Sequence, residues 1–187
     1  MEHSQKLWGG GKFCNPLDFQ ASRLNNSLSV DKRLFHEDII GSLAYAEILC
    51  DQKLLTKQEL DQMKEGFAII LNEWKTNKII FKNDDEDVHT VNERRLTELI
   101  GDVGKKIHVG RSRNEQVVVD MKLWMKDAIK SLLEKIAGFL TIIVDKSQKH
   151  LDVLMPGYTH LQRAQPIRFS HWLLSYGFFL QVFIYLF

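Results

Sequence analysis

The stretch RNEQVVVDMKLWMKDAIKSLLEKIAGFLTIIVDKSQKH, from Arg113 to His150, contains no proline, and only Gly138 interrupts its good helix formers. Its apolar residues recur at three- and four-residue steps, the period of one helix face. They are Val117, Met121, Trp124, Ala128, Leu132, Ile136, Leu140 and Ile143. Such a length exceeds that of ordinary globular helices and is typical of a helical bundle. We expect one long helix beginning near Ser112, with Val117, Met121 and Trp124 packed into a core.

Helical signals also precede this stretch. Thr56 and Glu59 have the spacing of a capping box at the start of an apolar-periodic segment. The segment from Asp87 to Gly101 has Thr90 and Glu93 at the same spacing, with Gly101 as its stop. Because no convincing strand run occurs elsewhere, the sequence predicts an all-α fold.

Composition excludes several classes of function. The chain has 187 residues, a formal net charge of +1, 26% charged residues and 44% hydrophobic residues. This balance gives no reason to expect nucleic acid or an anionic membrane as a partner. The two cysteines, Cys14 and Cys50, lie far apart, and the histidines lack paired metal-ligand spacing. We therefore expect reduced thiols, a cytoplasmic location and no metal site.

The segment MPGYTHLQRAQPIRFSHW, from Met155 to Trp172, is rich in residues suited to chemistry. It places His160 next to the hydroxyl of Thr159, between Pro156 and Pro166. A loop with this content before a helix can combine proton transfer with anion binding. The alternative is a polar connection whose side chains only cap helices and contact water.

A second polar segment, Gly110 to Asn114, surrounds the expected start of the long helix. Arg111, Ser112, Arg113 and Asn114 supply two guanidinium groups, a hydroxyl and an amide. Arginine matches carboxylates bidentately, and a helix N-terminus adds free N–H groups, so this place could hold a small dicarboxylate. The alternative is that Ser112 caps the helix while the arginines face water.

Taken together and in this order, these residues resemble the argininosuccinate lyases of the fumarase and aspartase superfamily. The resemblance runs from Lys6 to about Ser175. It is carried by an opening segment (Lys6–Gly10 and Phe13), an early stretch (Asn26–Asp31), an acidic turn (Asn83–Thr90), the Gly110–Asn114 segment and the histidine segment (Met155–Ser175).

This resemblance implies a fumarase/aspartase-like fold with two parts. Residues 1–111 would form an N-terminal helical lyase domain, and residues 112–187 the beginning of a central helical bundle. The implied reaction is cleavage of argininosuccinate to arginine and fumarate by β-elimination, without a cofactor, in arginine biosynthesis or the urea cycle. The family assembles each site from three subunits of a homotetramer.

The resemblance also assigns site residues. His160 is implied as a proton-transfer residue. The implied substrate contacts are Ser27, Asp31, Arg113, Asn114 and Thr159, and His89 and Asp87 are expected near the site without an assigned role. In the family, the partner acid/base serine lies in a Gly-Ser-Ser loop, which does not occur in these 187 residues.

The run from Trp172 to Phe187 has no charged residue, and its part from Tyr176 to Phe187 departs from the amphipathic helix expected there. It is short for a membrane span of about 20 apolar residues, so we interpret it as part of a truncated product rather than a tail anchor. Two alternatives to an active lyase remain open. One is a non-enzymatic relative of the lens-crystallin kind, and the other is an inactive truncated subunit that binds full-length partners.

Overall fold

The computed structural model describes residues 18–186, and the opening segment Lys6–Phe13 and Cys14 lie outside that range. The described elements, in chain order, are α1 (Phe19–Asn25), α2 (Leu28–Asp31), η1 (Lys32–Leu34), α3 (Phe35–Asp51), α4 (Lys57–Lys75), α5 (Val88–Ile100), η2 (Gly101–His108), α6 (Arg113–Lys149), β1 (Leu154–Thr159), β2 (Gln162–Arg168) and α7 (Phe169–Leu186). The predicted helical fold class is therefore confirmed.

The chain divides into two compact units, the first ending at Trp124 and the second beginning at Met125. The division falls inside α6, which contributes its first turns to one unit and its remainder to the other. The boundary expected between residues 111 and 112 stays a prediction.

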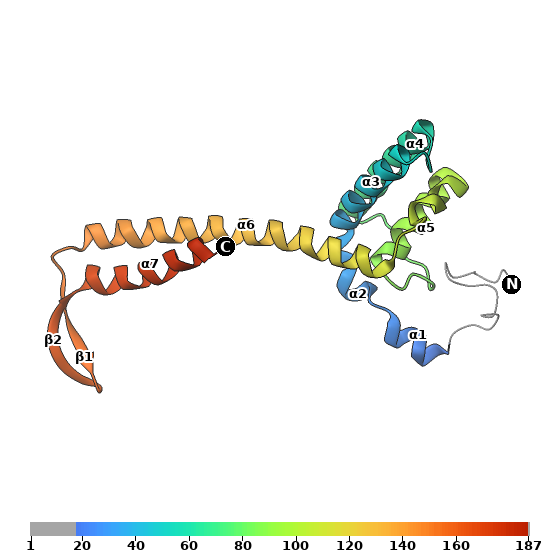
Figure 1. Ribbon diagram of the computed structural model, residues 1–187. Coiled ribbons are helices and arrows are strands. Elements are labelled where there is room, and N and C mark those ends of the chain that lie inside the picture. Colours follow the sequence, from blue (N-terminus) through green and yellow to red (C-terminus); the bar gives the residue numbers. More distant parts are fainter. Residues whose placement is uncertain (1–17, 187) are drawn as a thin grey trace. The chain divides into compact units, whose positions relative to one another are not determined.

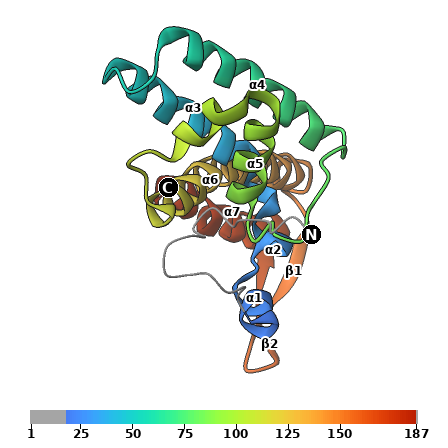
Figure 2. The same cartoon turned by 90° about the vertical axis from the view of Figure 1, so that its right-hand side faces the viewer.

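The core of the first unit lies among α3, α4, α5 and η2. Figure 2 shows the three α-helices that surround it. The most deeply buried side chains of this core include Ile39, Met63, Phe67, Ile70 and Leu96. Burial of a large apolar side chain contributes roughly 1.5–3 kcal/mol, so this cluster holds the three helices together. The helix starts follow local chemistry: at α4, Thr56 and Glu59 form the predicted capping box.

The start of α5 differs from the prediction. Its cap is Asp87, whose Oδ1 accepts hydrogen bonds from the Thr90 N–H at 2.6 Å and the Thr90 hydroxyl at 2.7 Å. Helix α5 therefore begins at Val88, whereas a cap at Thr90 would have started it three residues later, at Val91. An aspartate is as good a cap as a threonine, so spacing alone chose the wrong one. Gly101 ends the helix with φ 71°, as predicted.

Helix α6 runs from Arg113 to Lys149, which confirms the long helix. The expected burial of its apolar stripe is wrong for this chain, because Val117, Met121 and Trp124 expose 40%, 44% and 37% of their surface. The buried face in the first unit is instead polar and carries Gln116 and Asp120. The period was correct, but the apolar face is not the one that α3 and α5 cover.

In the second unit, the segment expected as a loop is an antiparallel β-hairpin (Figure 1). Thr159 pairs with Gln162, and His160 and Leu161 form the two-residue turn with φ of 50° and 62°. Two positive φ values in succession are the mark of a type I′ turn, which Asn-Gly usually signals. The strands are mostly exposed, and Pro156 pairs with Pro166. Their sequences, LMPGYT and QRAQPIR, lack the alternation of apolar and polar residue types that predicts a strand.

Helix α7 packs one side against the second half of α6, where Gly177 lies close to Leu140 and Ile143. Its other side is apolar and open: Phe178 and Phe179 expose 67% and 70% of their surface. By length and composition, α7 is the one described helix that could cross a membrane, but core helices of soluble proteins pass the same test.

Two glycines test the packing of this fold. A Cβ at Gly104 would lie 2.8 Å from the Thr97 nitrogen and 2.9 Å from its Cα, whereas one at Gly138 meets nothing within 4 Å. We expect Gly104→Ala to lower the free energy of unfolding by about 1–3 kcal/mol, because backbone must move to admit the methyl group. Gly138→Ala should raise it by about 0.5–1 kcal/mol through helix propensity. Urea unfolding followed by circular dichroism measures both, and equal stabilities would contradict this packing.

The open face of α7 predicts self-association. An exposed apolar patch of this kind marks an interface or an aggregation liability. We expect the 187-residue chain to form oligomers or precipitate, and Phe178→Glu with Val182→Glu, or removal of residues 176–187, to reduce this. Light scattering after size-exclusion chromatography is the measurement. Ile80→Glu, at an exposed apolar residue outside α7, is the control and should leave the association unchanged. A monodisperse unmodified monomer would refute the expectation.

Candidate active site

Two predicted substrate contacts, Ser27 and Asp31, are held against the start of α5. The Ser27 hydroxyl donates to Asp31 Oδ2 at 2.6 Å, and the Ser27 N–H donates to the Glu86 carbonyl at 2.8 Å. Asp31 Oδ1 accepts the Val88 N–H at 3.1 Å. Partial burial raises the pKa of Asp31, although these hydrogen bonds act against that rise. Helix α2 is therefore fixed to the turn before α5 by several specific bonds.

Arg113 reaches the same place from the first turn of α6. Its Nε lies 3.3 Å from Asp87 Oδ2, and its Nη1 donates to Gln116 Oε1 at 2.8 Å. Asp87 thus uses one oxygen to cap α5 and the other to pair with Arg113. The structure brings Ser27, Asp31 and Arg113 together around the N-terminus of α5.

Asn114 is exposed beside Arg113, and its N–H donates to the Ser112 hydroxyl at 3.3 Å. Arg111 instead turns inward: its Nη1 donates to the Ser42 hydroxyl at 2.9 Å, and its guanidinium lies 5.1 Å from the centre of the Tyr45 ring. Of the two arginines in this segment, Arg113 is the one placed near Ser27 and Asp31.

Thr159 and His160 belong to the second unit, whereas the other predicted site residues belong to the first. Thr159 is the last residue of β1, and His160 opens the turn of the hairpin. Both side chains are exposed. The hairpin therefore presents a hydroxyl and an imidazole together at its tip.

The structure also contains a buried polar cluster that the sequence analysis missed. Asp38 on α3 accepts hydrogen bonds from three side chains of α5 and α6: His89 Nδ1 at 2.8 Å, Asn92 Nδ2 at 2.7 Å and Gln116 Nε2 at 2.5 Å. Asp120, one helical turn beyond Gln116, lies with Oδ2 3.5 Å from the same His89 nitrogen.

A signal for this cluster was present in the sequence. Gln116 and Asp120 are four residues apart on a predicted helix, as are Asp38 and Ser42, so each pair shares a helix face. The apolar stripe of the long helix suggested a different buried face, and His89 was noted without a role.

The pKa values of two carboxyl groups in this cluster are shifted in opposite directions. Burial alone would raise the pKa of Asp38, but the hydrogen bonds from His89, Asn92 and Gln116 outweigh it and lower that pKa. Asp120 accepts from no such donor among residues 18–186, and burial together with the charge of Asp38 raises its pKa to about 7. Burial disfavours the charged form of His89, but its hydrogen bond to Asp38 outweighs burial and raises its pKa.

By spacing, Asp38, His89 and Asp120 could each offer one ligand atom to a metal ion, since the three atoms lie within 4.8 Å of one another. However, the His89 nitrogen already donates to Asp38, and the charge of Arg111 acts on Asp120. The His89 nitrogen is therefore already engaged, and the raised pKa of Asp120 favours a proton at that carboxyl group over a metal ion.

The pKa of Asp120 predicts how stability depends on pH. A carboxyl group with a native pKa of about 7, against an ordinary value of 3.8, binds its proton more tightly when folded. The stability from this proton is fully present below the ordinary pKa and is lost as pH rises through about 7. We expect Asp120→Asn, which keeps a neutral group, to remove about 1 kcal/mol of the decline in unfolding free energy between pH 6 and pH 8.

Urea unfolding at both pH values measures this difference. The pKa of His89 is also raised in the folded protein, so part of the decline in unfolding free energy should persist in the variant. Asp61→Asn, at an exposed aspartate of α4, is the matched control and should leave the decline unchanged. A decline that is equally steep in Asp120→Asn would show that Asp120 is ionised in the folded protein.

Comparison with known proteins shows which family the chain resembles in sequence. The model of a family described as Lyase matches residues 11–182. A probable argininosuccinate lyase of Schizosaccharomyces pombe is 49% identical over 95% of this chain and 39% of its own length. The argininosuccinate lyase of Chlamydomonas reinhardtii is 45% identical over 94% of this chain and 37% of its own length. The chain thus spans about two fifths of the length of these curated relatives.

Solved structures show the same fold. A variant EDDS lyase with bound fumarate superposes with a TM-score of 0.69 and 27% identity, covering 81% of this chain and 29% of the other. A fumarate lyase from Mesorhizobium sp. BNC1 superposes with a TM-score of 0.66 and 15% identity, covering 90% and 40%. The second similarity concerns the fold alone.

Proposed function

Since this chain belongs to the lyase family, we propose that it forms part of an argininosuccinate lyase, which cleaves argininosuccinate to arginine and fumarate by β-elimination. The observation that carries the proposal is the gathering of Ser27, Asp31 and Arg113 at the start of α5, in a chain whose relatives of that name match it over almost its whole length. These relatives are longer, so the activity is proposed for the whole protein.

Arg113 is suited to bind a carboxylate of the succinyl half. Its described contacts use Nε and Nη1, and none is described for Nη2 among residues 18–186. A guanidinium carries five N–H donors, so several remain for a ligand. Ser27 adds a hydroxyl, and Asn114 adds an exposed amide at the first turn of α6, where the helix dipole favours an anion.

His160 would serve one of the proton transfers, and Thr159 beside it would contact the substrate. In the reaction, a base removes a proton beside a carboxylate, the C–N bond breaks, the double bond of fumarate forms, and an acid protonates the departing guanidino nitrogen. Imidazole is the side chain best suited to such transfers near neutral pH. The second group would be the family's serine, in a segment outside these residues.

We also propose that the whole protein is a homotetramer in the cytoplasm. Val117, Met121 and Trp124 form an exposed apolar stripe on α6. This stripe supports a bundle with other subunits, because a stripe of this kind normally packs against another helix. The cytoplasmic location rests on the composition and the sparse cysteines.

The test is a fused protein. Residues 1–175 are joined to the C-terminal region of the Schizosaccharomyces pombe relative, and fumarate release from argininosuccinate is followed by ultraviolet absorbance. We expect turnover in the fused protein and none in the 187-residue chain alone. His160→Asn should lower kcat by roughly 10²–10⁴-fold, the usual effect of losing a general acid or base. Asn114→Ala should raise KM as well, because an amide beside a carboxylate acts by positioning.

His150→Asn, at an exposed histidine outside the hairpin, is the matched control and should leave turnover unchanged. Turnover by the 187 residues alone would overturn the assignment of the missing serine. A fused protein that is indifferent to His160 would overturn the site. A folded fused protein without any lyase activity would favour a crystallin-like relative.

A further inference from the structure

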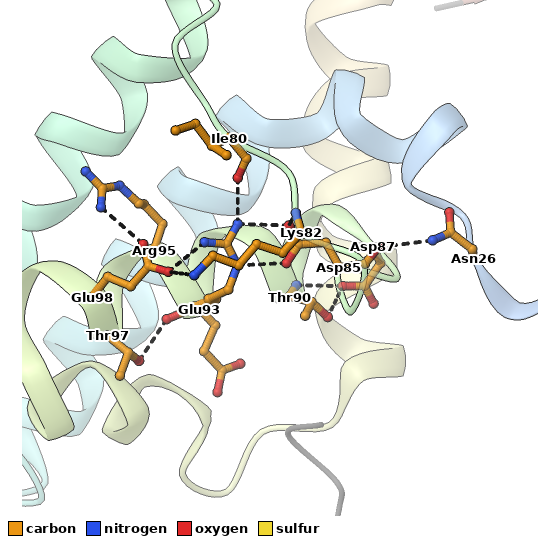
Figure 3. Close-up of polar contacts among 11 residues, drawn as sticks. Asn26, Ile80, Lys82, Asp85, Asp87, Thr90, Glu93, Arg95, Thr97 and Glu98 are labelled. Carbon is orange, nitrogen blue, oxygen red and sulfur yellow. Dashed lines mark hydrogen bonds and ion pairs between the residues drawn. The ribbon is translucent and has the colours of Figure 1, made fainter. Parts of the chain in front are cut away.

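Arg94 on α5 makes a concentrated set of contacts with the turn that precedes its own helix. Its Nε and Nη2 donate to the two oxygens of Asp85, each at 2.8 Å, which is a bidentate pair. Nη2 also donates to the Ile80 carbonyl at 2.9 Å, and Nη1 donates to Glu98 at 2.8 Å. Figure 3 shows Ile80, Asp85 and Glu98 converging on this part of α5.

Asp85, which Arg94 holds, also makes hydrogen bonds with the backbone of the turn and with Asn26. The residue is 2% exposed, and its Oδ2 also accepts the Lys82 N–H at 2.8 Å. The Asp85 N–H donates back to the Lys82 carbonyl at 3.1 Å, which closes the turn. The Asp85 carbonyl accepts the side-chain amide of Asn26 at 3.0 Å, a contact that Figure 3 also draws.

The residues after Asp85 hold the candidate site. The Glu86 carbonyl accepts the N–H groups of Ser27 at 2.8 Å and Leu28 at 3.2 Å. Asp87 caps α5 and pairs with Arg113. One short turn, Lys82–Asp87, therefore supports both Ser27 and Arg113, and the side chain that fixes this turn is Arg94.

We propose that Arg94 is a positioning residue, which holds the Lys82–Asp87 turn in the one conformation that places Ser27 and Asp87 for substrate binding. This rests on the proposed function only for the statement that Ser27 and Arg113 bind substrate. Arg94 itself contacts turn and helix rather than the site residues. Its effect passes through Asp85, whose buried carboxylate accepts from both arms of the guanidinium fork.

Lysine cannot replace this fork. An ammonium keeps the charge but is a point donor, so it cannot bond both oxygens of Asp85 and the Ile80 carbonyl in the fixed planar geometry of a guanidinium. Arg94→Lys should therefore keep the ion pair and loosen the turn. The neighbouring Arg95 is a matched control, since it pairs with Glu73 at 2.6 Å and Glu98 at 3.1 Å and has no described contact with the turn.

The first measurement is amide hydrogen exchange in the 187-residue chain. In Arg94→Lys, we expect exchange at Ser27, Leu28 and Lys82 to become at least about tenfold faster, because their acceptors belong to the turn. Exchange in the α4 core, at Ile70, should stay unchanged, and Arg95→Lys should leave all of the turn amides unchanged. Equal exchange in Arg94→Lys and the unmodified chain would overturn the proposal.

The second measurement is steady-state kinetics in the fused lyase. Arg94→Lys should raise KM by roughly tenfold and change kcat by less than about threefold, since it disturbs binding groups and not the proton-transfer residues. Arg95→Lys should match the unmodified enzyme. Faster exchange with an unchanged KM would show that the turn does not position substrate contacts, which also overturns the proposal. A fused protein without fumarate release would contradict the proposed function instead, while exchange would still decide whether Arg94 orders the turn.

Discussion

The first unit depends on one buried carboxylate. Asp38 is 1% exposed and accepts hydrogen bonds from His89 and Asn92 of α5 and from Gln116 of α6. A buried charge without partners is costly, so these donors must stay in place if Asp38 is to remain ionised. The apolar core holds α3, α4 and α5 together, but this carboxylate also fixes the first turns of α6, where Arg113 and Asn114 are found.

The hydrogen bond from Gln116 to Asp38 also orients Arg113. A carboxylate can only accept, so Gln116 must turn its amide nitrogen toward Asp38 and its oxygen toward Arg113. The guanidinium is then held between the Gln116 oxygen and the Asp87 carboxylate. Arg113 is thus kept in one direction before a ligand arrives, and the entropy of ordering this long side chain is lost on folding rather than on binding.

Sequence predicted the parts of this structure that depend on local chemistry and period. The Thr56 capping box, the Gly101 stop and the length of α6 follow from residue types at fixed spacing. The cap of α5 was misplaced because Asp87 and Thr90 compete for one role. The hairpin was missed because His160 and Leu161 adopt positive φ without glycine or asparagine. Asp38 was missed because its partners come from helices 51 and 78 residues away. The site residues themselves came from the resemblance, and their roles stay predictions.

The burial of α6 explains why its apolar stripe predicted the wrong buried face. A helix in one small unit buries one face, and here that face carries Gln116 and Asp120 because they meet Asp38 and His89. The apolar stripe beside it then stays partly exposed among the described residues of the first unit, although its residues have the spacing of a bundle helix. A helix with a polar face bound inside its own unit and an apolar face left open can join a site to a subunit interface. If the proposed tetramer packs on that stripe, the first turn of α6 would be held from both sides, by Asp38 and by assembly, and the orientation of Arg113 would depend on both.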